Sequence, residues 1–167
     1  MKSQFTKENE KYNNETLVII SSTHSGDIHH ILNNTVDHIE SINIKLVPYP
    51  EKHGQLTQSG KNGNLQSSGM VYERDYEEEI SEYIKTITQS IQDYIKTHDN
   101  SITRMIVAAP ASIHSELSDA LLDTLHNVHL FEISLIDGNY TKTPLQDALS
   151  ILDGKELNAN ILMKNIN

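Results

Sequence analysis

The sequence contains no cysteine among its 167 residues, which excludes disulfide bonds, thiolate metal sites and cysteine nucleophiles. It has no apolar run near the roughly 18 residues that cross a bilayer, and the polar stretch after Met1 predicts no secretion signal. Basic residues are scarce: 13 Lys and Arg stand against 23 Asp and Glu, a net charge of -10. These absences predict a cytoplasmic protein without a membrane segment. Its negative charge should repel nucleic acid unless basic residues gather locally.

The length and the distribution of polar residues predict one folded domain. A chain of 167 residues fits a single core, and its hydrophobic content of 37% is below the usual globular share. The polar excess gathers in three stretches. We therefore expect a flexible segment over residues 1–15, a domain over 16–153 that contains a long loop over 51–70, and a polar tail over 154–167.

Three strand-like runs open the domain. Thr16–Ser21 is a continuous, β-branched apolar run, typical of a strand buried on both faces. Asp27–Leu32 follows after a short turn. Val36–Val47 then alternates apolar and polar residues as a half-exposed edge strand does, until Pro48 and Pro50 end it. The short links between these runs predict an antiparallel meander.

Helices and strands alternate in the second half. Isoleucines recur at three- and four-residue steps across 71–98, which predicts an amphipathic helix. The later elements are a strand over Thr103–Ala109, a helix over Ala111–Leu125, a strand over Val128–Ser134, and a helix from Thr143 to Leu152 with Asp153-Gly154 as its cap. Strands joined by helices run parallel, with right-handed crossovers. The order predicts a single three-layer α/β domain with a mixed five-stranded sheet, strand order 3-2-1-4-5, as in ribonuclease-H-like folds.

The loop over 51–70 begins with the most distinctive motif of the chain, Pro50-Glu51-Lys52-His53-Gly54-Gln55. A loop of about twenty residues inside a compact domain is typically functional or disordered. With Lys61, the motif also holds the best local group of basic residues in this acidic chain.

The element order, the loop position and several short motifs together resemble a known family. These motifs are Leu17 to Ser21, the acidic helix start Tyr72 to Glu79, and Ile106-Val107-Ala108-Ala109-Pro110. Over roughly residues 16–153 the chain resembles the host attachment proteins, bacterial relatives of the archaeo-eukaryotic release factors.

The resemblance implies a function in translation. Release factors carry a Gly-Gly-Gln loop that enters the peptidyl-transferase centre, and the segment before it commonly reads Pro-x-Lys-His-Gly. Here Pro50 to Gln55 is similar, but only Gly54 precedes Gln55, and His53 lacks the backbone freedom of a second glycine. By resemblance, Gln55 is a candidate catalytic residue that would position water. Lys52, His53, Gly54 and Lys61 are candidate RNA-binding residues.

Three functional hypotheses follow. The first is a non-enzymatic module that binds the ribosome or tRNA, the second a peptidyl-tRNA ester hydrolase that uses Gln55, and the third a protein linked indirectly to attachment to host cells. A homodimer through the edge strand is a further possibility. We expect no cofactor.

Histidines and carboxylates do not predict a metal centre. His29 and His30 are neighbours and would point to opposite faces of a strand, so a metal would need a further ligand such as His38. Asp27, Glu40 and Asp137 could suggest a two-metal nuclease. Such enzymes need carboxylates on the central strand, and Leu17–Ser21 has none.

Overall fold

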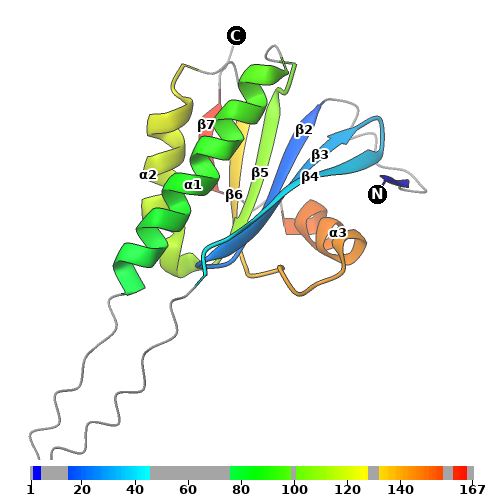
Figure 1. Cartoon of the computed structure of the whole chain (residues 1–167). Helices are drawn as coiled ribbons and strands as arrows, with labels where there is room; N and C mark the ends of the chain where they lie inside the picture. Colours follow the sequence, from blue (N-terminus) through cyan, green and yellow to red (C-terminus); the bar gives the residue numbers. More distant parts are fainter. Residues whose placement is uncertain are drawn as a thin grey trace, which may run out of the picture.

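The computed structural model describes residues 2–4, 15–45, 76–98, 101–127, 132–155 and 160–164 (Figure 1). The elements in chain order are β1 (Lys2–Gln4), β2 (Thr16–Ser21), β3 (Ser25–Leu32), β4 (Thr35–Asn43), α1 (Tyr76–Thr97), β5 (Arg104–Ala109), the short 3-10 helix η2 (Ala111–Ile113), α2 (His114–Leu125), β6 (Glu132–Asp137), α3 (Leu145–Lys155) and β7 (Asn160–Lys164).

The strands form one mixed sheet in the order β1-β4-β3-β2-β5-β6-β7. The pairs β2–β3 and β3–β4 are antiparallel, whereas β2–β5 and β5–β6 are parallel. The five central strands therefore have the predicted order 3-2-1-4-5, and the α/β fold class is confirmed.

Two strands at the edges of the sheet were not assigned from the sequence. β1 pairs antiparallel with β4, where Lys2 lies opposite Asp37, and β7 pairs antiparallel with β6. From its sequence, the third strand was expected to be an edge strand. Over Thr35–Asp37, however, β4 is paired on both sides. Backbone hydrogen bonds place such short strands, so hydrophobic periodicity gives little sign of them.

Element boundaries differ from the expectation in two informative places. The third strand ends at Asn43 rather than at Val47, and α3 continues to Lys155, so Gly154 lies inside the helix instead of capping it. A tight turn at Asn33 and Asn34, both with positive φ (48° and 61°), joins β3 to β4. Asparagine tolerates this left-handed conformation better than most residues, which favours the turn at this point.

Helices cover both faces of the sheet, with α1 and α2 on one side and α3 on the other (Figure 1). Alternation along β2 builds both cores: Leu17 and Ile19 pack with α1 and α2, whereas Val18 and Ile20 pack with α3. This explains why β2 is apolar at almost every position. No helix in the described ranges is long and apolar enough to cross a membrane.

Candidate functional site

The carboxyl ends of four strands meet at one edge of the sheet, which we call the carboxyl edge. β4 runs antiparallel to β3 and β3 antiparallel to β2, so β4 points the same way as β2, β5 and β6. Ser21, Asn43, Ala109 and Asp137 end these strands. In open α/β sheets, ligands bind outside the carboxyl ends of parallel strands. This edge is therefore the first place to look for a site.

The two described elements that flank the segment with the predicted site residues lie at the carboxyl edge. The segment joins the end of β4 to the start of α1, both of which lie at the lower edge of the view in Figure 1. Ile44, just after β4, and Ile80, in the second turn of α1, pack against the same core cluster. The amide of Ile44 also donates a hydrogen bond to the carbonyl oxygen of His24 at 3.0 Å.

The predicted residues themselves are Lys52, His53, Gly54, Gln55 and Lys61. All five lie outside the described residues, so their roles stay predictions. The described part of the chain shows where the elements on either side of their segment lie.

A buried tyrosine joins three elements at this edge. Tyr83 of α1 is fully buried, and its Oη lies 2.7 Å from Oγ of Ser21 at the end of β2. Ser21 Oγ also donates to the carbonyl oxygen of Ser22 at 2.8 Å, so the Tyr83 hydroxyl must be the donor to Ser21. Burial raises the pKa of the Tyr83 phenol far above its ordinary value, while the bond to Ser21 opposes the shift. The phenol therefore stays protonated at neutral pH.

Gly26 makes this contact sterically possible. It is the cross-strand partner of Ser21 at the start of β3, and a Cβ at this position would clash with Tyr83 Oη. It would also lie 3.0 Å from Ile87 Cδ1. Sequence reasoning missed this contact, although a glycine inside a strand is a known sign of close approach by another group.

Serine side chains hold the turn between β2 and β3. Ser22 Oγ lies 2.8 Å from Ser25 Oγ and accepts hydrogen bonds from the amides of His24 (3.3 Å) and Ser25 (3.0 Å). The His24 ring contacts a threonine instead: its Nδ1 lies 3.1 Å from Oγ1 of Thr23. The hydrogen bonds recorded for Ser21, Ser22 and Ser25 thus go to backbone or to other hydroxyls, as in a structural turn. They form no nucleophile–base pair in the described part of the chain.

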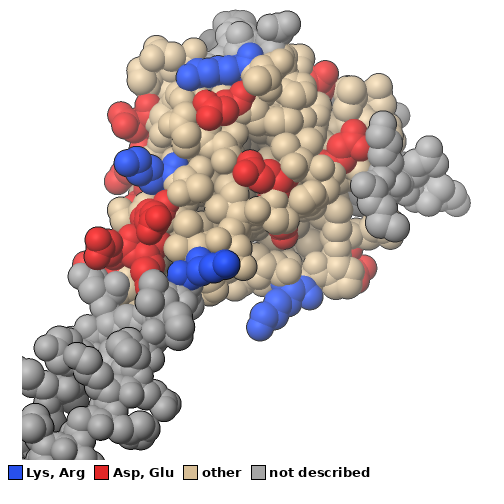
Figure 2. Space-filling view, in the orientation of Figure 1, with Lys and Arg blue, Asp and Glu red and all other residues tan. Residues whose placement is uncertain are grey.

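Several acidic side chains lie on the described surface around the carboxyl edge. Glu77, Glu78 and Glu79 occupy the first turn of α1, where the helix dipole favours negative charge. Glu116 lies in the first turn of α2, and Asp137 is exposed at the end of β6. Acidic side chains gather at the lower left of Figure 2, over the start of α1. The described basic residues near this edge include Lys45, exposed just after β4, and Lys142, exposed between β6 and α3. The sequence adds Lys52 and Lys61 in the β4–α1 segment, and attraction to a polyanion at this edge would come from such lysines.

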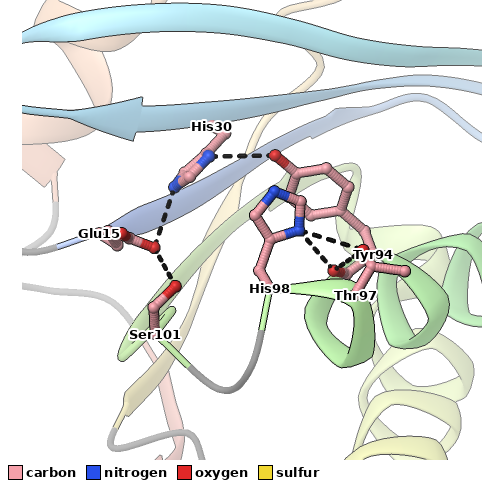
Figure 3. A network of polar contacts seen from close by, with 6 residues as sticks. All are labelled: Glu15, His30, Tyr94, Thr97, His98 and Ser101. Carbon is pink, nitrogen blue, oxygen red and sulfur yellow. Dashed lines mark hydrogen bonds and ion pairs between the residues drawn. The ribbon is translucent and has the colours of Figure 1, made fainter.

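A second polar network lies at the opposite edge of the sheet (Figure 3). His30 of β3 has its Nδ1 3.0 Å from Oη of Tyr94 in α1, and its Nε2 lies 3.5 Å from Oε2 of Glu15. Ser101 Oγ donates to the same Glu15 oxygen. His98 Nδ1 lies 2.9 Å from the backbone carbonyl oxygen of Tyr94, which can only accept, so this nitrogen of His98 carries a proton.

This network is electrostatically mixed. Burial lowers the pKa of His30, and so does the nearby His98 ring, whereas Glu15 and Asp37 raise it. The Glu15 carboxylate attracts the protonated form of His30. The two side chains form an ion pair rather than a hydrogen bond, because His30 Nε2 has no hydrogen-bond partner. Ser101 bonds to Glu15 and not to His30, so this arrangement is unlike a catalytic triad, in which the histidine takes the serine proton.

His29 and His30 face opposite sides of the sheet, as strand alternation predicts. His30 meets α1, whereas the His29 ring lies edge-on to its cross-strand partner His38, with ring centroids 5.3 Å apart. Burial and the nearby His38 lower the pKa of His29, and Asp27 opposes this. Within the described ranges, no three His or carboxylate residues are arranged to hold a metal ion.

The three candidate nuclease carboxylates do not come together. Asp27 lies on β3 and Asp137 at the end of β6, which are three strands apart or about 14 Å. Glu40 pairs with Ile28, whose side chain belongs to the core under α1. Asp27 instead accepts a hydrogen bond from Ser41 at 2.5 Å. The two-metal arrangement is therefore absent from these residues.

Comparison with known proteins gives a distant likeness. No family model and no curated protein matches the chain. One similar solved structure is Dom34 of S. cerevisiae, a translation termination-like factor involved in RNA quality control pathways (TM-score 0.48, 12% identity, 90% of this chain and 37% of that chain covered). Another is the archaeal translation termination factor aRF1 (TM-score 0.47, 14% identity, 87% and 41% covered). The chain spans less than half of either structure.

At these identities the likeness concerns the path of the chain alone. Both structures have names of the release-factor kind that the sequence resemblance implied. No match supports the narrower assignment to host attachment proteins. The residues of this chain therefore have to carry any functional proposal, and the carboxyl edge with its attached segment is the site to which they point.

Proposed function

We propose that this protein is a translation-associated binding module, which contacts the ribosome or tRNA through the segment between β4 and α1. The observation that carries the proposal is the attachment of this segment at the carboxyl edge, between Ile44 and Ile80. Its motif Lys52-His53-Gly54-Gln55 is the part of the chain that resembles the release-factor loop. On this proposal, the packed domain is a scaffold that presents the segment.

The described residues support a scaffold better than an enzyme. The Ser21 hydroxyl is committed to Ser22 and Tyr83, and the Ser22 hydroxyl to Ser25. The carboxylates Asp27 and Asp137 are far apart on the sheet. If the protein does hydrolyse an ester, the chemistry falls to Gln55, and Gln55→Ala should then abolish turnover of peptidyl-tRNA.

Charge limits how such a module can bind. With a net charge of -10 and an acidic surface at the start of α1, the domain is repelled by RNA phosphates. Two lysines that each neutralise one phosphate would give a slope of log affinity against log salt between about -1 and -2. We therefore expect weak but measurable association that decreases as salt is raised.

Gradient sedimentation of native lysate at low and moderate salt tests the proposal. The protein should migrate with ribosomal particles at low salt, and Lys52→Ala with Lys61→Ala should reduce the bound fraction. The matched control is Lys85→Ala with Lys96→Ala, which removes two exposed lysines of α1 outside the β4–α1 segment. Migration of the wild type only as free protein at low salt rejects the proposal. Equal losses in both double variants would mean that only total charge matters.

A further inference from the structure

We propose that the Tyr83 hydroxyl is a positioning group: it sets the direction in which the first turns of α1 leave the sheet, and association at the carboxyl edge depends on that direction. The dependence on association rests on the function proposed above. The positioning itself rests on described contacts and can be tested separately.

The first turns of α1 precede the fully buried part of the helix. The buried residues of this helix begin only at Tyr83. Before it, Tyr76 is 54% exposed, Glu79 and Ile80 are half-buried, and the remaining residues Glu77, Glu78, Ser81 and Glu82 are exposed. Tyr83 is therefore the first fully buried side chain of α1, and it anchors the helix close to its start.

The hydroxyl of Tyr83 adds direction to that anchor. Its ring packs in the core under α1, as the neighbouring isoleucines do, but its Oη reaches across Gly26 to Ser21 on the next strand. One side chain of α1 is thus fixed against both β2 and β3. Because Tyr83 is fully buried, water does not compete for this hydrogen bond.

Distance along the helix magnifies a small change at Tyr83. Tyr76 lies about 10 Å up the helix axis, so a tilt of about 10° at Tyr83 would move the helix start by roughly 2 Å. A shift of this size moves the point at which the β4–α1 segment joins the helix. Loss of the hydroxyl can therefore weaken association without unfolding the domain.

The chain offers a matched control on the same helix. Tyr94→Phe also removes one hydroxyl of α1 that bonds to a side chain, but its partner His30 lies at the opposite edge of the sheet. Both variants keep the aromatic ring. We expect Tyr83→Phe to reduce the ribosome-bound fraction, and Tyr94→Phe to leave it unchanged.

Amide hydrogen exchange tests the positioning without any partner. Tyr83→Phe should speed exchange of the amides from Ile80 to Ile84 and leave those from Gln92 to Lys96 unaltered, and Tyr94→Phe should do the reverse. If Tyr83→Phe leaves exchange near Ile80 as in the wild type, the hydroxyl does not position the helix start and the inference is wrong.

The outcomes separate this inference from the proposed function. A wild type that never sediments with ribosomes, together with faster exchange in Tyr83→Phe, rejects the binding function and retains the positioning. A wild type that sediments, with Tyr83→Phe bound equally well, rejects the dependence of binding on the hydroxyl. Equal loss of binding in both tyrosine variants would point to general destabilisation and also overturns the inference.

Discussion

Tyr83 and Tyr94 attach the two ends of the same helix to the same sheet in different ways. Tyr83 is fully buried, and its partner Ser21 does not titrate. Tyr94 is half-buried, and its partner His30 can titrate. The carboxylates Glu15 and Asp37 raise the pKa of His30, against the effect of burial. The attachment at the carboxyl edge is therefore independent of pH, whereas the attachment at the other edge can change with protonation. The end of the domain from which the candidate segment departs has the more constant attachment.

The substitution Gly26→Ala should have the largest effect on this comparison. The new Cβ would clash with Tyr83 Oη and press against Ile87, so we expect a loss of about 1–3 kcal/mol in the free energy of unfolding. Urea denaturation measures it. Because the hydroxyl is the closest group, adding Tyr83→Phe to Gly26→Ala should restore part of the loss.

Gly154→Ala is the matched control for that experiment. A Cβ at Gly154 meets nothing within 4 Å, and the residue lies inside α3. Alanine favours helix over glycine by about 1 kcal/mol, so this variant should be as stable as the wild type or more stable. A loss in Gly154→Ala equal to that in Gly26→Ala would contradict the steric explanation.

Removal of each tyrosine hydroxyl should have a smaller effect. Tyr83→Phe and Tyr94→Phe each lose one hydrogen bond, worth about 1 kcal/mol. The comparison becomes sharper when unfolding is measured across pH. The cost of Tyr83→Phe should be constant, and the cost of Tyr94→Phe should vary as His30 changes its proton state. If both variants lose the same free energy of unfolding at every pH, the two attachments do not differ in their dependence on pH.

We expect the pH dependence that His29 and His30 add to be the smallest effect, because nearby carboxylates oppose the effect of burial. Both pKa values are lowered from the ordinary 6.5, so the unfolded chain binds these protons more tightly. Above 6.5 these two residues add no pH dependence. As the pH falls through 6.5 towards the folded pKa values, stability should be lost. Urea midpoints measured from about pH 8 to about pH 5 show it.

The double variant His29→Gln with His30→Gln should flatten that pH profile. His126→Gln is a suitable control, because this exposed residue lies beyond the end of α2. A profile that stays equally steep without His29 and His30 would assign the pH dependence to other groups.

The sequence was sufficient to predict the central sheet. The apolar run at Thr16–Ser21, the alternation after Val36 and the isoleucine spacing in α1 are strong local patterns, and the crossover rule then orders the strands. Strand alternation also placed His29 and His30 on opposite faces, as the structure has them.

The candidate site was less accessible to sequence reasoning. The contact of Tyr83 with Ser21 joins residues 62 positions apart, and no local sequence pattern predicts it. β1 is three polar residues with no pattern to read, whereas β7 holds the apolar run Ile161-Leu162-Met163 inside a stretch that was expected to be a polar tail. The Lys52-to-Gln55 motif lies outside the described residues, and its role stays a prediction.

Gradient sedimentation of the wild type at low salt, beside Lys52→Ala with Lys61→Ala and the control Lys85→Ala with Lys96→Ala, tests the central claim most directly. We predict that the wild type and the control migrate with ribosomal particles, and that the Lys52 and Lys61 variant remains mostly free. A wild type found only as free protein under these conditions would contradict the proposed translation function.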